Sequence, residues 1–277
     1  MHEYYLMIKS FNGEFFYGAN QVSDNVDTID VSVFSTDDFS KQYQFIAHGE
    51  ALSPSRNAIS DDGRLVATAL WADYGKGDLF VFEYGKEILH LRKFGRVEWI
   101  KFIQDNKLLV GEGGKTYYID IESQDIVSVV PCFELFRNPF GEDIILKNRN
   151  TIVFNGKNVK GSTFSLFDVL GLEDGVVASE VSNCAIKYDY HGNKIWESAT
   201  KQRGHIISMN YNPVTRVLFG RAHDILAIDI NTGEVIAEIE NKTGIFVSKG
   251  DKELLIDYDC NCYEICNNVL RKISQYH

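Results

Sequence analysis

Short runs of aliphatic and aromatic residues alternate with polar turns along the whole chain, and each run has the length and composition of a β-strand. Seven of these strands end in a polar residue that enters a tight turn, after which another strand begins. The turn-entry residues are Ser35, Glu83, Asp120, Asn155, Asp189, Asp229 and Glu264. By subtraction, their separations are 48, 37, 35, 34, 40 and 35 residues. The pattern therefore indicates a repeat of about 40 residues that is built only of strands.

A strand-only repeat of this length predicts a β-propeller, in which each repeat forms one four-stranded blade. No stretch shows a sustained helical period with capping residues, so the predicted fold class is all-β. Seven repeats occupy residues 1–277 as a single propeller domain. The fourth repeat has the weakest pattern, with strands predicted over residues 133–136, 144–146, 151–154 and 159–165. A six-bladed propeller is the alternative if this repeat is degenerate.

Two hairpins carry a more specific signal than the repeat length. Residues 227–235 have the sequence AIDINTGEV, and residues 188–196 have the sequence YDYHGNKIW. Both resemble the hairpin between the third and fourth strands of a blade in quinoprotein-like and YVTN-type propellers. Trp196 stands where that family places a docking tryptophan after the turn glycine, and residues 118–122 (YIDIE) form a partial third copy. The resemblance implies the fold and says little about activity.

The resemblance is incomplete in two respects. Ala237 occupies the position at which the sixth repeat would carry a docking tryptophan. No repeat ends in the Trp-Asp pair of WD40 proteins. The chain is therefore placed in the WD40/YVTN/quinoprotein-like superfamily without assignment to one of its families.

The chain is acidic, with 39 Asp and Glu residues against 28 Lys and Arg residues and a formal net charge of −11. Proteins bind nucleic acids largely by neutralising phosphates with Lys and Arg, so this balance argues against a nucleic-acid partner. The same charge would attract a basic protein partner. It would also keep a cytoplasmic protein soluble without any partner.

Three features of the sequence bear on location. Residues 1–16 (MHEYYLMIKSFNGEFF) lack the basic and apolar segments of a secretory signal, and no apolar run approaches the ~18 residues of a membrane span. The five cysteines are odd in number and lie mostly within predicted strands, which is typical of reduced thiols. Unless a signal has been removed, we expect a cytoplasmic protein, monomeric by itself and with no membrane partner.

Loop length distinguishes two faces of the predicted propeller. With the strands of a blade named a to d from the centre outwards, the a–b and c–d links are short turns, whereas several d–a and b–c links are longer and more polar. The longer links cover residues 20–27, 48–56, 72–77 and 201–204. Propellers similar to this one bind ligands mainly where the d–a and b–c loops meet, and binding residues concentrate in such loops. We call this the loop face.

The charged and aromatic residues of the loop face are the candidate partner-binding residues. They are Asp24, Asp27, His48, Glu50, Trp71, Asp73, Tyr74, Arg96, Glu112, Arg203, His205, Arg221 and His223, and the loop that follows His48 also offers Arg56. Trp71 and Tyr74 beside Asp73 have the composition of an interface hot spot. The simplest alternative is that most of these residues are solvated side chains at the rim and that Trp71 packs between blades.

These observations favour a non-catalytic propeller that docks a protein partner on its loop face. The acidic surface would allow that partner to be basic. Charge, size and the missing catalytic motifs suggest one specific form, an inhibitor or immunity protein of a toxin. A subunit of a larger assembly is a further alternative.

The alternative from another class is a hydrolase or lyase with a metal at the central channel. His48, His205 and His223 share the loop face and could converge on an ion with Glu112 or Asp73. However, the sequence contains no HExxH, Gly-x-Ser-x-Gly or paired CxxC motif. We therefore predict no catalytic residue, no metal ligand and no cofactor.

Three cysteines, Cys260, Cys262 and Cys266, lie close together in the sequence. Along a strand, the four-residue spacing of Cys262 and Cys266 spans roughly 13 Å, too far for two ligands of one zinc ion. We expect two buried small hydrophobic residues and an exposed thiol instead.

Overall fold

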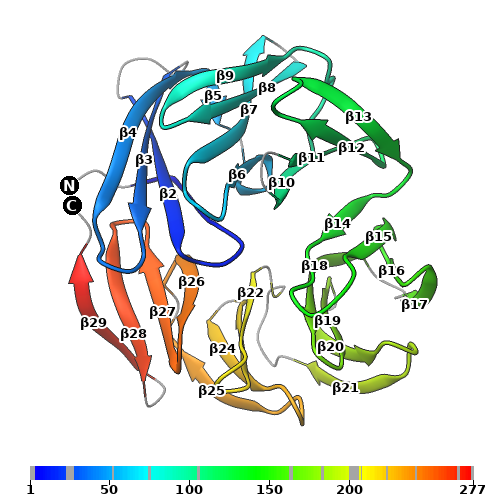
Figure 1. Ribbon diagram of the computed structural model, residues 1–277. Helices are drawn as coiled ribbons and strands as arrows, with labels where there is room; N and C mark the ends of the chain where they lie inside the picture. Colours follow the sequence, from blue (N-terminus) through cyan, green and yellow to red (C-terminus); the bar gives the residue numbers. More distant parts are fainter. Residues whose placement is uncertain are drawn as a thin grey trace. The chain divides into compact units, whose positions relative to one another are not determined.

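The computed structural model describes residues 4–22, 28–51, 53–73, 76–104, 107–161, 165–181, 184–199, 206, 208–222, 224–240, 242–266 and 269–275. Within these ranges the chain forms seven antiparallel sheets, and in six of them the four strands pair in sequence order (Figure 1). Each sheet is the blade of a β-propeller, so the predicted all-β class is confirmed. The same ranges contain one 3-10 turn, and no helix in them has the length and apolarity to cross a membrane.

The chain divides into two compact units. Unit 1 comprises Met1–Pro131, Ile256–Cys262 and Ile273–His277, and unit 2 comprises Cys132–Leu255 and Tyr263–Lys272. The first three blades lie in unit 1, and the fourth to sixth blades lie in unit 2. The residues of the seventh blade are divided between the two units.

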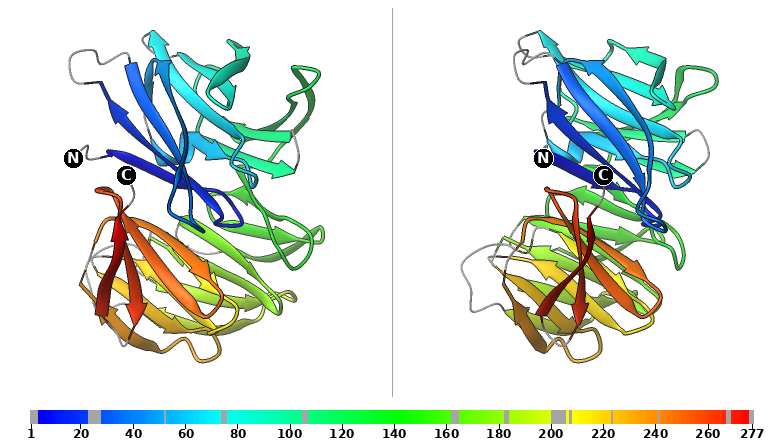
Figure 2. Two further views of the ribbon diagram at one scale, coloured as in Figure 1. Left: turned by 60° about the vertical axis from the view of Figure 1, so that its left-hand side comes forward. Right: turned by 90° about the vertical axis from the view of Figure 1, so that its left-hand side faces the viewer.

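The strands of the first three blades have the following bounds. The first blade consists of β1 (Leu6–Lys9), β2 (Phe15–Gln21), β3 (Thr28–Ser35) and β4 (Lys41–His48). The second consists of β5 (Glu50–Ala51), the 3-10 turn η1 (Pro54–Arg56), β6 (Asn57–Ile59), β7 (Leu65–Asp73), β8 (Lys76–Glu83) and β9 (Lys86–Leu91). The third consists of β10 (Trp99–Gln104), β11 (Lys107–Glu112), β12 (Lys115–Asp120) and β13 (Asp125–Val130). Figure 2 shows β2, β3 and β4 side by side in shades of blue.

The remaining four blades each contain four strands. The fourth consists of β14 (Glu134–Phe136), β15 (Ile144–Asn148), β16 (Thr151–Phe154) and β17 (Lys157–Gly161). The fifth consists of β18 (Leu166–Leu172), β19 (Gly175–Glu180), β20 (Cys184–Asp189) and β21 (Lys194–Ala199). The sixth consists of β22 (Met209–Asn212), β23 (Val217–Arg221), β24 (Ile225–Asp229) and β25 (Val235–Ile239). The seventh consists of β26 (Gly244–Lys249), β27 (Lys252–Asp257), β28 (Asn261–Cys266) and β29 (Val269–Gln275). Because the fourth blade is complete, the six-bladed alternative is wrong.

The second blade differs from the prediction in two places. Its innermost strand is interrupted, since β5 and β6 both pair with β7 and η1 is inserted between them. Residues 48–56, expected to be one loop, therefore contain a short strand and a helical turn. The link at residues 72–77 is also not a long loop, because Trp71 pairs with Gly77 and Asp73 with Lys76 in a continued hairpin.

The core lies between the faces of consecutive blades. One cluster joins the first and second blades around Tyr17, Val33 and Leu70, and another joins the second and third around Leu79 and Leu108. In unit 2, equivalent clusters join the fourth to the fifth blade, the fifth to the sixth and the sixth to the seventh. Strands inside a blade are thus covered on both faces, and every residue of β19 is buried. The outer strand β4 shows alternating burial instead.

The predicted docking tryptophan does dock. Trp196 lies on β21, and its indole Nε1 donates a hydrogen bond of 2.8 Å to the carbonyl oxygen of Ile230 in the sixth blade. Its ring also covers Gly233, where a Cβ atom would lie 2.7 Å from the ring and where φ is +75°. Phe45 on β4 covers Gly85 of the second blade in the same manner. An aromatic side chain of an outer strand therefore packs on the turn of the next blade in both units.

The regular carboxylates at the turns stabilise their own hairpins. The Asp229 carboxylate accepts hydrogen bonds from the backbone N–H groups of Asn231 and Thr232, at 2.8 and 3.0 Å. Asp189 accepts from the backbone of His191 and Asn193 in the same way, and Asp120 accepts from the backbone of Ser123. These residues are part of the scaffold.

Candidate functional site

The structure describes the candidate partner-binding residues unevenly. Six of them lie outside the described residues: Asp24, Asp27, Tyr74, Arg203, His205 and His223. For Glu50, Trp71 and Asp73, the structure describes the backbone positions in β5 and β7 but not the side chains. The aromatic hot spot around Trp71 therefore stays a prediction. His48, Arg96 and Glu112 can be placed in unit 1, and Arg221 in unit 2.

Glu112 holds a loop in place. It is the last residue of β11, and its Oε1 accepts hydrogen bonds from the backbone N–H of Gly95 and, at 2.7 Å, from that of Arg96. These contacts fix the connection between β9 and β10. The Arg96 side chain is exposed. Glu112 therefore has a structural role, and the loop that it holds presents the Arg96 side chain to solvent.

Arg221 is the last residue of β23 and is half-buried. Its Nη1 donates a long hydrogen bond of 3.4 Å to the carbonyl oxygen of Gly244, the first residue of β26. Its backbone N–H donates to the carbonyl oxygen of Ser208. Arg221 thus links the sixth blade to the seventh within unit 2.

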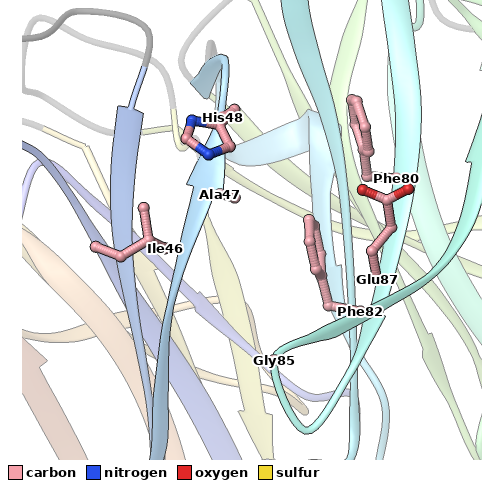
Figure 3. A pocket seen from close by; sticks show the side chains of 7 residues that line it. All are labelled: Ile46, Ala47, His48, Phe80, Phe82, Gly85 and Glu87. Atoms are coloured by element: carbon pink, nitrogen blue, oxygen red, sulfur yellow. The ribbon is translucent and has the colours of Figure 1, made fainter.

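His48 lines a cavity between the first and second blades, drawn in Figure 3. The cavity has a volume of about 240 Å³ and is lined by Ile46, Ala47, His48, Phe80, Phe82, Gly85 and Glu87. We call it the blade 1–2 pocket. Strand β4 supplies one wall, whereas β8, β9 and the turn between them supply the other. All of these residues belong to unit 1.

The floor of the blade 1–2 pocket is aromatic and well supported. Phe82 packs on Phe45 with ring centroids 4.8 Å apart. Phe80 stacks on His90 at 4.1 Å, and His90 Nε2 lies 2.8 Å from the Asp78 carboxylate. Because these neighbours hold both rings, the pocket is largely preformed.

The rim of the pocket carries one apolar and two polar side chains. Ile46 is 53 % exposed. His48 and Glu87 are exposed on opposite walls (Figure 3). Within the described ranges, the Glu87 carboxylate makes no hydrogen bond or ion pair. The arrangement can therefore accept an apolar side chain and pair with a neighbouring positive charge.

Within the part of the chain that the structure describes, no group of three or more His, Cys, Asp or Glu residues is arranged to hold a metal ion. Because His205 and His223 lie outside that part, the predicted histidine convergence stays untested. Cys260 and Cys262 are buried and Cys266 is half-exposed. Burial, followed by the charge of Asp257, raises the pKa of the Cys260 thiol to about 12, which disfavours the thiolate that zinc requires.

Sequence reasoning missed Phe80, Phe82 and Glu87, because the strand pattern assigns them to the scaffold. Alternation along β8 marks Phe80 and Phe82 as side chains on one face of the strand. Nothing in the sequence shows that the neighbouring blade leaves part of that face uncovered. The pocket arises only when β4 and β8 come together.

Comparison with solved structures shows the fold. Hsv2 of Kluyveromyces lactis is 10 % identical, with 99 % of this chain and 98 % of that chain covered at a TM-score of 0.73. KlAtg21, solved in a complex with the coiled-coil of AgAtg16, is 12 % identical, with 99 % of this chain and 100 % of that chain covered at a TM-score of 0.72. The C-terminal WD40 domain of Sif2 is 11 % identical, with 100 % and 87 % covered at a TM-score of 0.66.

The chain therefore has the fold of a seven-bladed β-propeller, and this fold is similar to that of the WD40 domain of Sif2. No protein-family model matches the sequence. No curated protein matches it either. At these identities the similarity defines the architecture and not the activity.

Proposed function

We propose that this chain is a non-catalytic binding propeller that docks a basic segment of a protein partner at the blade 1–2 pocket and the adjoining loop face. The observation that carries the proposal is the pocket itself. It combines a preformed aromatic floor, the exposed Ile46 at its rim and the carboxylate of Glu87, which pairs with no other described residue. His48, at the end of β4, joins the pocket to the loop that follows.

Charge favours a basic occupant. Glu87 has no cationic partner among the described residues, and the chain carries a formal net charge of −11. A Lys or Arg next to an apolar side chain on the partner would pair with Glu87 while the apolar group enters the pocket. Long-range attraction would also speed encounter with such a partner.

The comparisons support a protein partner in general terms. KlAtg21, a propeller of similar fold, was solved with a coiled-coil bound. This precedent supports the use of the architecture for protein binding and does not indicate a coiled coil as the partner here.

A finer form of the proposal is that the partner is a basic toxin and the chain its inhibitor or immunity protein. Acidic charge and the absence of catalytic sequence motifs support this form. Mixing the purified protein with a candidate basic toxin tests it. The expected result is a complex with lost toxicity, and a toxin that stays active and unbound contradicts this form.

The docking site is tested with matched surface variants. Ile46→Glu places a charge at the pocket rim, and Ile195→Glu makes the same change at a residue of similar exposure (52 %) on β21. Both variants should fold, because neither residue is buried. Affinity capture from host lysate with wild-type protein should retain a partner that Ile46→Glu loses and Ile195→Glu keeps. Equal retention by both variants would show that the partner binds elsewhere.

A further inference from the structure

Two arginines on neighbouring blades of unit 1 lie close together. Arg56 is the last residue of η1, and Arg96 lies in the connection between β9 and β10. The Ser55 hydroxyl donates a hydrogen bond of 3.1 Å to the carbonyl oxygen of Glu98, and η1 packs against β10. Glu112 fixes the backbone of Arg96 from the other side. The two side chains are thus presented from well-anchored positions.

Neither guanidinium group has a partner in the described part of the chain. Both side chains lack a hydrogen bond and an ion pair there, and the Nε of Arg56 is buried without an acceptor. Partial burial, followed by the like charge of Arg96, lowers the pKa of the Arg56 guanidinium. Arginine nevertheless stays protonated, so the repulsion between the two groups persists in the absence of an anion.

Two carboxylates lie near the arginines without a hydrogen bond to either guanidinium group in the described part of the chain. Glu98 lies close to Arg56, but its Oε2 is buried without a hydrogen-bond partner. The Glu112 carboxylate is occupied by two backbone N–H groups. A carboxylate keeps its charge when it accepts hydrogen bonds, so Glu98 and Glu112 balance the two arginines in net charge. In the described part of the chain, however, neither carboxylate is hydrogen-bonded to a guanidinium group.

We propose that Arg56 and Arg96 together bind a carboxylate group. The planar guanidinium group matches the two oxygens of a carboxylate, and the two arginines offer N–H donors that have no acceptor in the described structure. The carboxylate can be that of a small organic acid or that of an acidic side chain on a peptide. This site is separate from the blade 1–2 pocket and does not depend on the function proposed above.

Calorimetric titration at constant ionic strength tests the proposal with three probes: sodium glutarate, a short oligoglutamate peptide and inorganic phosphate. Wild-type protein should bind at least one of the two carboxylate probes. Arg56→Gln and Arg96→Gln should each lower that affinity at least about tenfold, because a hydrogen bond to a charged group contributes about 1.5–3 kcal/mol. Arg92→Gln is the matched control and should bind as wild type, since Arg92 lies beside Asp78 at 3.5 Å.

The outcomes separate the sources of the carboxylate. Binding of glutarate assigns the site to small acids, and binding of the peptide alone assigns it to an acidic segment; both support the proposal. Failure of wild type to bind either carboxylate, tighter binding of phosphate, or unchanged binding by both glutamine variants would overturn it. If Arg56→Gln unfolds, Arg56→Lys serves instead, and it should bind more weakly than wild type because it keeps the charge but loses the paired donors.

Discussion

At the scale of single residues, side chains of the same type have different roles according to their hydrogen bonds. Asp229 accepts two backbone N–H groups and stabilises its own turn. Glu112 also accepts two, although its sequence position on the loop face suggested a binding role. Glu87 accepts none in the described structure and is available to a partner. The free carboxylate, and not the regularly spaced ones, is the candidate for function.

The turn aspartates predict a specific dependence of stability on pH. Hydrogen bonds from the backbone N–H groups of Asn231 and Thr232 lower the pKa of Asp229. A lowered folded-state pKa stabilises the protein above the unfolded-state value of about 3.9 and loses this effect as pH falls through the folded-state value. Asp229→Asn should therefore be less stable than wild type at pH 7, and the difference should shrink below pH 4.

Thermal unfolding at pH 7 and pH 3 measures this effect. Asp251→Asn is the control, since Asp251 is exposed and makes no hydrogen bond among the described residues. It should leave the melting temperature unchanged at both pH values. A constant difference between Asp229→Asn and wild type at the two pH values would contradict the assigned role.

At the scale of elements, an aromatic side chain of an outer strand packs on a turn glycine of the next blade at two blade junctions. Trp196 on Gly233 was expected from the hairpin motif, whereas Phe45 on Gly85 has the same arrangement without that motif. The sixth blade carries Ala237 at the equivalent position, and Ala237 is buried in the cluster between the sixth and seventh blades. The junction of the sixth and seventh blades is therefore packed by apolar side chains without a docking tryptophan.

Two glycines with nearly the same backbone conformation isolate the value of this packing. Gly233 has φ of +75° and lies against Trp196, whereas Gly114 has φ of +74° and has nothing within 4 Å of its ideal Cβ position. Gly114→Ala should cost only the strain of positive φ, about 1 kcal/mol. Gly233→Ala should cost about 1–3 kcal/mol more, because the tryptophan must move.

Urea unfolding of the two alanine variants gives the comparison directly. The slope of the transition should stay the same, so that the midpoints report stability. Equal midpoints for Gly233→Ala and Gly114→Ala would show that Trp196 contributes little to the junction of the fifth and sixth blades.

At the scale of the whole molecule, the repeat was predictable from sequence because turns and strands are local. Ser35, Glu83, Asp120, Asp189 and Asp229 each end the third strand of their blade, as predicted. Asn155 follows its strand by one residue, and Glu264 lies inside β28, where the strand continues to Cys266. Residues 72–77 were predicted to be one of the longer, more polar links, but cross-strand pairing of Trp71 with Gly77 closes a hairpin there.

The candidate sites were less predictable because they require contact between separate blades. His48, Arg56 and Arg96 were identified from loop position, but their neighbours were not. Phe80 and Glu87 come from the outer part of the second blade, and only its approach to β4 creates the pocket. A neighbouring blade covers only part of a strand face, and no local sequence pattern shows which part stays uncovered.

The most direct test of the central claim, that the blade 1–2 pocket docks a protein partner, is site-specific photo-crosslinking. A photoreactive residue is placed at position 46 or, as a control, at position 195, and the protein is irradiated in the presence of its captured partner. Ile46 lies at the pocket rim and Ile195 lies on β21, with similar exposure. The account predicts a covalent adduct from position 46 and none from position 195. An adduct from position 195 alone, or equal adducts from both, would contradict it.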